Sequence, residues 1–223
     1  FVEGQAGICY NFGIPNQEEH YMKLTWLGHA CFMLESAEGS VVFDPYAPNY
    51  VPGFELPELE ADECICSHKH DDHYYPQGVK LSGKAHGLKI SAVSCFHDEK
   101  QGSLRGDNLI SIVEAEGMRA VHLGDLGHML DDIQFDALGK IDVLMIPIGG
   151  FYTIDSKTAA ELVKKLQPKI VVPMHYKGKS FGYDVLETRD AFLAMMDNVK
   201  YFDSRSIIIC PETESMTVAF KIE

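Results

Sequence analysis

The segment His68-Lys69-His70-Asp71-Asp72-His73 places three imidazoles and two carboxylates within six residues. Imidazole nitrogens and carboxylate oxygens are the ligands that ions such as Zn²⁺ and Mn²⁺ take in proteins. The segment follows the short apolar run 64–66, at the point where a strand passes into a loop and side chains can converge without burying unpaired charge. A single histidine in such a loop is usually a surface residue, but this density predicts a metal site.

The remaining candidate ligands share one property, which is that each follows an apolar, strand-like run. They are His97, Asp125 and His175. Strand ends of one sheet system lie along one edge, so these side chains can meet although they are far apart in the sequence. Each alone could be a solvated loop residue, and together with the histidine segment they predict one shared site.

The elements that must position these residues are mostly strands at first, with helices between them later. Strand patterns cover 23–35, 41–44, 63–67, 89–96, 109–114, 119–123, 142–148, 169–174, 207–209 and 217–222, and helix patterns cover 155–166 and 188–196. Glu116-Gly117 predicts a hairpin turn, and Asp155 or Ser156 predicts a helix N-cap. The pattern indicates one α/β domain over 22–223, preceded by an extension of unclear role over 1–21.

The composition excludes some classes of protein. A formal charge of −14, with 46% hydrophobic and 23% charged residues, is typical of a soluble globular domain. It argues against a nucleic-acid binder, which needs clustered Lys and Arg. No apolar run reaches the roughly 20 residues that span a bilayer. The six cysteines form no C-x-x-C pair, so we expect a reducing compartment and hence a cytoplasmic protein.

The order H-x-H-x-D-H, then His, Gly-Asp and His resembles the metallo-β-lactamase superfamily of metallohydrolases. The stretches 22–44, 122–128, 147–150 and 173–176 are similar to its branch of ascorbate-6-phosphate lactonase-like and N-acylphosphatidylethanolamine phospholipase D-like proteins. The resemblance covers nearly all of 22–223. It implies a four-layer αββα sandwich, the metallo-β-lactamase fold, with a metal site at one edge.

The resemblance also implies a ligand set for two divalent ions. His68, His70 and His97 would bind the first ion, Asp72, His73 and His175 would bind the second, and Asp125 would bridge both. Zn²⁺ is the expected metal, with Mn²⁺ or Fe²⁺ as alternatives. His70 stands where the di-iron oxidoreductases of the superfamily carry Glu, which argues against that chemistry.

Two divalent ions that share Asp125 can lower the pKa of a bound water towards 7 and polarise a carbonyl or phosphoryl oxygen. The expected reaction is therefore hydrolysis of an ester, lactone or phosphodiester of a small polar metabolite by a metal-bridging hydroxide. Asp72, Asp125 and His128 are the candidate catalytic residues. No G-x-S-x-G nucleophile motif is present. Two alternatives stay open: a nuclease-like phosphodiesterase, and a metal-binding protein of the same fold without turnover.

Neighbouring polar residues could contact the substrate or orient the ligands. The candidates for substrate contact are Asn108, Tyr152, Tyr176 and Lys177, and those for orienting roles are His29, Asp44 and Asp71. Loop turns and ordinary capping are the alternative interpretations. We expect a small-molecule substrate and no nucleic-acid or membrane partner, and the resemblance is compatible with a homo-oligomer.

Overall fold

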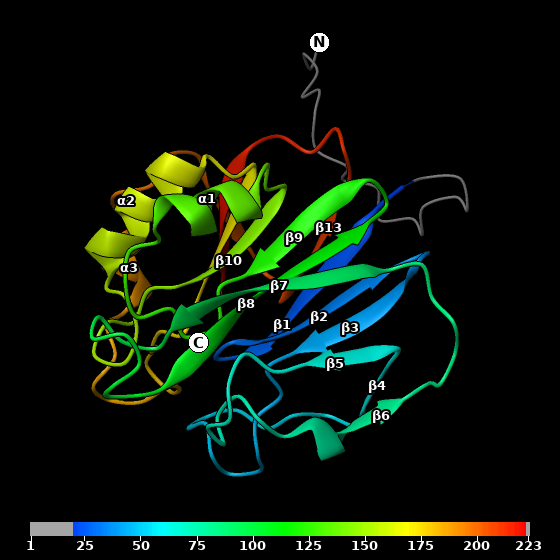
Figure 1. The fold of residues 1–223 in the computed structure, drawn as a ribbon, viewed down its shortest axis with the longest axis horizontal. Helices are drawn as coiled ribbons and strands as arrows, with labels where there is room; N and C mark the ends of the chain where they lie inside the picture. The colour runs from blue at the N-terminus through cyan, green and yellow to red at the C-terminus, as the bar shows by residue number, and fades with distance from the viewer. Residues whose placement is uncertain (1–19, 222–223) are drawn as a thin grey trace.

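The computed structural model describes residues 20–221. Apart from His20 and Tyr21, the extension predicted over 1–21 lies outside the described residues. Two β-sheets pack face to face around one hydrophobic core (Figure 1). Within the described residues, the first strand begins at Met22.

The first sheet has five strands in the order β13-β1-β2-β3-β5. They are β1 (Met22–Gly28), β2 (Cys31–Ser36), β3 (Gly39–Phe43), β5 (Glu63–Ile65) and β13 (Ser206–Ile209). Buried and half-buried residues alternate along β1, the period of two expected when one face of a strand meets the core. A turn at His29 and Ala30 divides the strand-like run 23–35 by folding β2 back onto β1.

The second sheet has seven strands in the order β12-β14-β11-β10-β9-β8-β7. They are β7 (Lys89–Phe96), β8 (Asp107–Ala115), β9 (Met118–His122), β10 (Val143–Pro147), β11 (Ile170–Met174), β12 (Val199–Phe202) and β14 (Met216–Phe220). All residues of β10 and β11 are buried, as expected for parallel strands covered on both faces. The β8–β9 hairpin turns at Glu116 and Gly117, both with positive φ, as predicted.

The three helices of the described chain lie together beside the seven-stranded sheet (Figure 1). They are α1 (Asp132–Leu138), α2 (Ser156–Leu166) and α3 (Arg189–Leu193). The cap of α2 is the predicted one, because the Asp155 side chain accepts a hydrogen bond from the backbone N–H of Thr158. A small pair of strands, β4 (Leu59–Ala61) and β6 (Val79–Leu81), and the 3₁₀ turn η1 (Pro76–Gly78) complete the fold.

Aromatic contacts join the two sheets. Trp26 of β1 stacks on Phe220 of β14, with ring centres 6.0 Å apart. The ring of Phe43 of β3 lies parallel to that of His122 of β9, with ring centres 5.2 Å apart. Nε2 of His122 lies 2.8 Å from the carbonyl oxygen of Ala30. These contacts build one continuous core, so the two sheets form the α/β sandwich that the sequence predicts.

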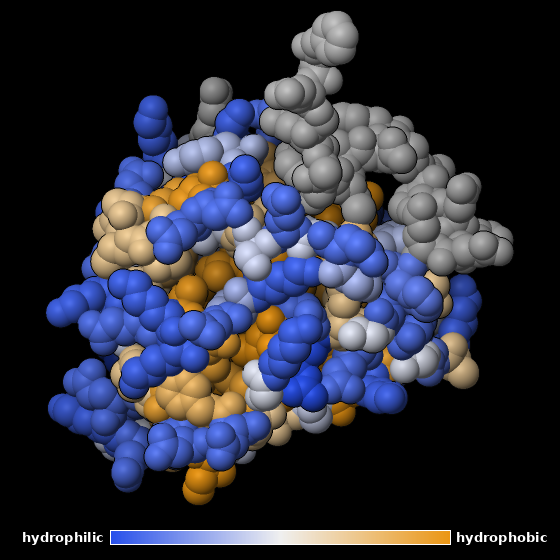
Figure 2. All heavy atoms as spheres, turned by 90° about the horizontal axis from the view of Figure 1, so that it is seen from above, coloured by the Kyte–Doolittle hydropathy of each residue, from blue (hydrophilic) through white to orange (hydrophobic). Residues whose placement is uncertain are grey.

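Hydrophilic residues cover most of the face seen in Figure 2, with hydrophobic residues visible in the hollows between them. This is the usual surface of a domain that keeps its large apolar side chains in the core. Within residues 20–221, none of the helices has both the length and the apolar character required to cross a membrane.

Candidate metal centre

The predicted ligands meet at the seam between the two sheets. The five-stranded sheet contributes the segment 68–73, which follows β5, and the seven-stranded sheet contributes the residues that follow β7, β9 and β11. The structure brings together seven predicted ligands, His68, His70, Asp72, His73, His97, Asp125 and His175. Convergence of strand ends at one edge, expected from the sequence, therefore positions the cluster.

Asp125 lies at the centre of this cluster and is 2% exposed. Its Oδ2 atom faces imidazole nitrogens that come from both sheets. The distances from Oδ2 are 3.2 Å to Nε2 of His73, 3.2 Å to Nε2 of His97, 3.2 Å to Nε2 of His175 and 4.0 Å to Nε2 of His68. One carboxylate thus has the position that a group shared between two ions requires.

Donor atoms gather in three sets, and the atoms of each set lie within 4.8 Å of one another. The sets are His29, Asp72, His73 and His175; His68, His70 and His97; and His68, His73 and Asp125. The last set connects the other two through His68 and His73. The arrangement has the form of two neighbouring sites rather than one.

Several buried polar atoms of the cluster have no hydrogen-bond partner within residues 20–221. They are Nε2 of His68 and His73, both ring nitrogens of His29 and His175, Nδ1 of His97 and Oδ1 of Asp125. Leaving a buried polar atom unpaired costs about 1–3 kcal/mol, so a fold does not gather several of them in one place without a ligand. Imidazole and carboxylate donors in this arrangement fit divalent metal ions.

Burial keeps two of the imidazoles neutral. Burial and the neighbouring His73 lower the pKa of His68 to about 3, and burial and the neighbouring His175 lower the pKa of His29 to about 4. Burial alone would raise the pKa of Asp125, but His175 and His73 outweigh it and hold that pKa well below its usual range. Neutral nitrogens and an ionised carboxylate are the protonation states that bind metal.

Asp44, which follows β3, orients the histidine segment. Its carboxylate accepts hydrogen bonds of 2.7 Å from the backbone N–H and from the hydroxyl of Ser67, and lies 2.7 Å from Nδ1 of His73. Nε2 of His73 is then left to face Asp125. Burial alone would lower the pKa of His73, but Asp125 and Asp44 raise it well above its ordinary value. This contact is the one that an orienting carboxylate makes in metal sites.

Asn108, a predicted substrate residue, holds Asp125 in place. Its Oδ1 accepts a 2.9 Å hydrogen bond from the backbone N–H of Asp125, and its Nδ2 donates to the carbonyl of Leu123 at 2.9 Å. Asn108 is fully buried. The side chain therefore fixes the loop that follows β9, and Asn108 also lines the cavity beside His68, so its contact with a substrate stays a prediction.

The backbone at the site adopts conformations that few residues tolerate. His29, Asp44 and His175 all have a positive φ, of 54°, 43° and 54°. Such conformations cost about 1–3 kcal/mol in non-glycine residues and gather at functional sites. The carbonyl of His29 accepts hydrogen bonds from Nε1 of Trp26 at 2.9 Å and from the backbone N–H of His175 at 3.2 Å. The turn after β1 is therefore tied directly to the end of β11.

The other predicted substrate residues lie beside the cluster. Tyr176 is 2% exposed and stacks on Trp26 with ring centres 5.3 Å apart, so it belongs to the core. Nζ of Lys177 donates to the carbonyl of Asp184. Tyr152, in the loop after β10, is half-buried, so part of its side chain remains accessible to a substrate.

His128 and Asp71 lie outside the donor sets. Nε2 of His128 accepts a 3.1 Å hydrogen bond from the backbone N–H of Phe96, and Nδ1 lies 2.7 Å from the carbonyl of Met129. With both ring nitrogens engaged, His128 holds its loop and has no nitrogen left for a proton transfer, so the geometry does not support its predicted catalytic role. Asp71 is exposed and, through a hydrogen bond, raises the pKa of Tyr50.

A cavity of about 650 Å³ borders the cluster on the side of His68 and His70. This volume suits a small-molecule ligand. Besides the two histidines, Lys69, Tyr74 and Arg105 line it. His70 is exposed, so this side of the cluster is open to the cavity.

Arg105 is fixed at the edge of this cavity. Its backbone N–H donates to the carboxylate of the buried Asp98 at 2.8 Å, and its Nη2 donates to the carbonyl of Phe151 at 2.8 Å. Its guanidinium lies 5.9 Å from the ring centre of Tyr152, and no carboxylate of residues 20–221 forms an ion pair with it. Sequence analysis missed Arg105, and the Gly106 that follows it was the only local sign of a constrained loop.

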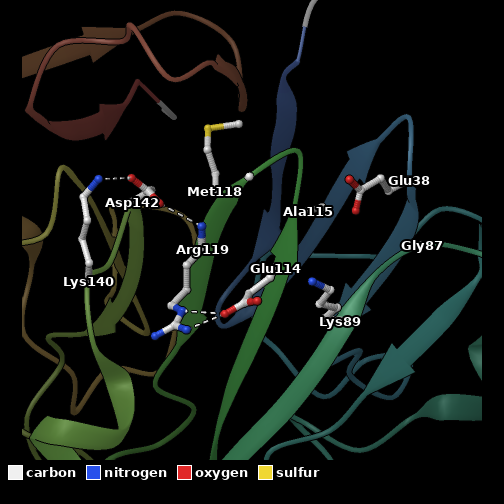
Figure 3. Close-up of a pocket in the computed structure, with 10 residues that line it drawn as sticks. Glu38, Gly87, Lys89, Glu114, Ala115, Met118, Arg119, Lys140 and Asp142 are labelled. Atoms are coloured by element: carbon white, nitrogen blue, oxygen red, sulfur yellow. Dashed lines mark hydrogen bonds and ion pairs between the residues drawn. The ribbon is translucent and has the colours of Figure 1, made fainter.

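A second pocket, of about 610 Å³, lies at the β8–β9 turn (Figure 3). Its charged groups neutralise one another: Arg119 donates to Glu114, and Nζ of Lys140 lies 3.5 Å from a carboxylate oxygen of Asp142 (Figure 3). None of the three donor sets contributes to its lining. The cavity beside His68, in contrast, is lined by two residues of the donor sets, His68 and His70.

Several known proteins are similar to this chain in sequence and fold. The family model described as Beta-lactamase superfamily domain matches residues 23–175. UPF0173 metal-dependent hydrolases of Thermoplasma acidophilum and Thermococcus kodakarensis are 28% and 30% identical over 188 and 190 residues, which cover 70% of this chain and 83% and 84% of those proteins.

Among solved structures, a proposed Zn-dependent hydrolase of the metallo-beta-lactamase superfamily from Thermotoga maritima is 34% identical, with a TM-score of 0.74. The match covers 91% of this chain and 100% of that chain. The names of these three proteins include neither the lactonase nor the phospholipase D activity of the branch that the sequence resembles, so that branch stays a prediction.

Proposed function

The chain belongs to the metallo-beta-lactamase superfamily and, within it, to the UPF0173 family of metal-dependent hydrolases, and on that premise we propose that it hydrolyses an ester, lactone or phosphodiester bond of a small anionic metabolite at a two-metal site. The observation that carries the proposal is the position of Asp125, whose Oδ2 atom lies 3.2 Å from the nearest nitrogens of both predicted ion sites. A carboxylate that can reach both ions is the kind of ligand that a two-metal hydrolytic site requires.

Two divalent ions bound here would supply an activated water and would stabilise the negative charge that develops on the substrate. The residues that would hold them are His68, His70 and His97 for the first, Asp72, His73 and His175 for the second, and Asp125 for both. We propose Zn²⁺, with Mn²⁺ or Fe²⁺ as alternatives, because all three bind imidazole together with carboxylate.

Aromatic residues form the wall on the side of the second ion. The ring centre of Tyr183 lies 5.5 Å from that of His29, edge to face, and 6.3 Å from that of Tyr152. Burial and Asp72 raise the pKa of Tyr183, so its hydroxyl stays protonated and donates to the carbonyl of Tyr50 at 3.0 Å. We propose that this wall excludes water from the reacting bond and packs against the rest of the substrate.

The charge of the substrate follows from the cavity. Arg105 is held by Asp98 and Phe151 before any ligand arrives, and Lys69 lines the same cavity. A guanidinium fixed in this way suits a carboxylate or phosphate group, with little further entropy lost on binding. The proposed substrate therefore carries an anionic group in addition to the bond that is broken.

Cys31, Cys64, Cys66 and Cys95 are thiols rather than disulfides. Thiols persist in the reducing cytoplasm, so the proposal includes a cytoplasmic location. Cell fractionation with an antibody against the chain would test it.

The direct test combines metal analysis with hydrolysis. Protein purified without chelator is expected to contain about two transition-metal ions per chain and to hydrolyse at least one of 4-nitrophenyl acetate, γ-butyrolactone and bis(4-nitrophenyl) phosphate. Asp125→Asn should lower both the metal content and the rate, the rate by about 100-fold or more. Asp203→Asn, an exposed aspartate that pairs with Lys221, is the matched control.

Two other outcomes would contradict the proposed hydrolysis at a two-metal site. Two bound ions without hydrolysis of any probe would favour the metal-binding alternative without turnover. A chain that binds no ion after addition of Zn²⁺ and Mn²⁺ would overturn the proposal.

A further inference from the structure

His29 has the surroundings of a metal ligand. It is 1% exposed, and neither of its ring nitrogens has a hydrogen-bond partner within residues 20–221. Its Nε2 lies 3.4 Å from Oδ2 of Asp72, and its ring centre lies 4.0 Å from that of His175. A fully buried imidazole with two unpaired nitrogens is costly, and His29 shares one donor set with all three predicted ligands of the second ion, Asp72, His73 and His175.

The contact between His29 and Asp72 differs from that of an orienting pair. Where a carboxylate orients a ligand in this protein, the contact is short and direct, as between Asp44 and Nδ1 of His73 at 2.7 Å. The separation of 3.4 Å between Nε2 of His29 and Oδ2 of Asp72 is longer, and it is the distance of an ion pair rather than of a short hydrogen bond. Metal–ligand distances of about 2.0–2.2 Å in tetrahedral geometry place two ligand atoms of one ion about 3.3 Å apart, so the separation of 3.4 Å between Nε2 of His29 and Oδ2 of Asp72 fits two ligands of the same ion.

We propose that His29 binds the second ion directly, together with Asp72, His73 and His175, and that the two ions are consequently held unequally. The inference rests on the proposed two-metal site. Three members of the second set are buried, and Asp72 is half-buried. The first set, in contrast, includes the exposed His70 and borders the 650 Å³ cavity.

The unequal retention of the two ions would have a consequence for function. An ion held by the second set would be retained longer and would bind first, because this set offers four donors against three and none of them is exposed. The ion bound by His68, His70 and His97 exchanges more readily and is the one that a substrate in the cavity reaches.

The test is a metal titration of the full chain after removal of its metal with chelator. The variant is His29→Asn, because asparagine tolerates the positive φ of this position better than other residues. The hydrogen bonds that the carbonyl of residue 29 accepts from the Trp26 indole and from the backbone N–H of His175 do not depend on the side chain at position 29. His86→Asn, at a histidine outside the donor sets that contacts Glu63, is the matched control.

Calorimetric titration with Zn²⁺ in a competing chelator is expected to show two steps of different affinity in the parent chain and in His86→Asn. In His29→Asn the tighter step should weaken by more than about 100-fold, beyond the 10- to 100-fold loss typical of an orienting partner. Two equal steps in the parent chain would overturn the inequality.

A second measurement separates a ligand from an orienting group without relying on the variant. In the parent chain labelled with ¹⁵N-histidine, one equivalent of Co²⁺ should give three strongly shifted imidazole N–H signals that assign to His29, His73 and His175 and not to His68, His70 or His97. Two such signals would mean that His29 does not bind the ion, and the proposal would fail. If the chain binds both ions in this order but hydrolyses nothing, the proposed function fails and this inference stands.

Discussion

Arg105 is a charged side chain whose position is fixed by backbone contacts rather than by an opposite charge. The Asp98 carboxylate accepts hydrogen bonds from the backbone N–H groups of Lys100, Gly102, Leu104 and Arg105. Four donors on one buried carboxylate make the loop rigid. Selectivity for an anionic substrate would then depend on Arg105, which lies outside the H-x-H-x-D-H segment 68–73.

Arg105→Met should therefore change selectivity more than rate. We expect the ratio of kcat/KM for 4-nitrophenyl hemisuccinate to kcat/KM for 4-nitrophenyl acetate to fall about tenfold, which corresponds to one lost charged hydrogen bond. Hydrolysis of the neutral acetate should stay close to that of the parent chain. Lys100→Met, on the same loop, serves as control, and an unchanged ratio would remove Arg105 from substrate recognition.

Asp98 predicts a specific pH dependence of stability. Burial alone would raise its pKa, but the backbone N–H groups of Arg105 and Lys100, with the other two donors, outweigh burial and lower it. Because the folded pKa lies below the unfolded value of about 3.9, the stabilisation is complete above that value and is lost as the pH falls towards the folded pKa.

In urea unfolding of metal-free protein, the parent chain should therefore lose stability more steeply below about pH 5 than Asp98→Asn. Asp98→Asn should already be less stable at pH 7, because an amide cannot accept all four hydrogen bonds. Parallel pH profiles for the two proteins would show that the carboxylate charge contributes nothing.

At the scale of elements, the sequence was informative where one local signal dominated. The continuous apolar run of β10 and the cap of α2 at Asp155 lie where the pattern predicts them. α1 was missed although Asp131 and Gln134 form a capping box, because its exposed Ile133 breaks the apolar periodicity on which the prediction relied. β12, with no fully buried residue, gave no periodic signal either.

Gly149 shows how the connection after β10 constrains the site. A Cβ at this position would lie 2.1 Å from the carbonyl oxygen of His175, so any side chain must displace β11 or its ligand. Gly149→Ala should destabilise the chain by about 1–3 kcal/mol, the usual cost of overpacking, and should lower its metal content.

Gly83→Ala separates crowding from backbone strain. Gly83 has a φ of +67°, and a Cβ there would meet no atom within 4 Å. This variant should lose about 1 kcal/mol or less and keep its full metal content. If both variants lost metal equally, crowding at His175 would not be the cause.

For the molecule as a whole, the metal centre is also a connection between its two sheets. His29 and the segment 68–73 extend from one sheet, whereas His97, Asp125 and His175 extend from the other. Removal of metal should leave the buried donors unpaired and weaken this connection. Calorimetric scans should show a higher Tm with Zn²⁺ than with chelator, because Zn²⁺ at a thousandfold excess over its Kd raises the free energy of unfolding by about 4 kcal/mol. An identical Tm in both conditions would show that the cluster does not stabilise the fold.

The candidate site was predictable to the extent that its residues are adjacent in a motif or end a strand. His68, His70, His73 and the ends of three later strands met these conditions. Tyr183 and Asp98 did not, because their positions follow from loop contacts between segments far apart in the chain. Tyr183, for example, bonds to Tyr50, a pairing that no local pattern encodes.

The pairing of β13 with β1 has a consequence for how cells make this protein. Met22 pairs with Ile209 across the edge of the five-stranded sheet, so β1 lacks this neighbour until residues 206–209 have left the ribosome. An open, apolar strand edge recruits other strands, and domains begin to fold while synthesis continues. The nascent chain is therefore expected to need chaperone protection during translation, and ribosome stalling before residue 206 should yield aggregates rather than a folded fragment.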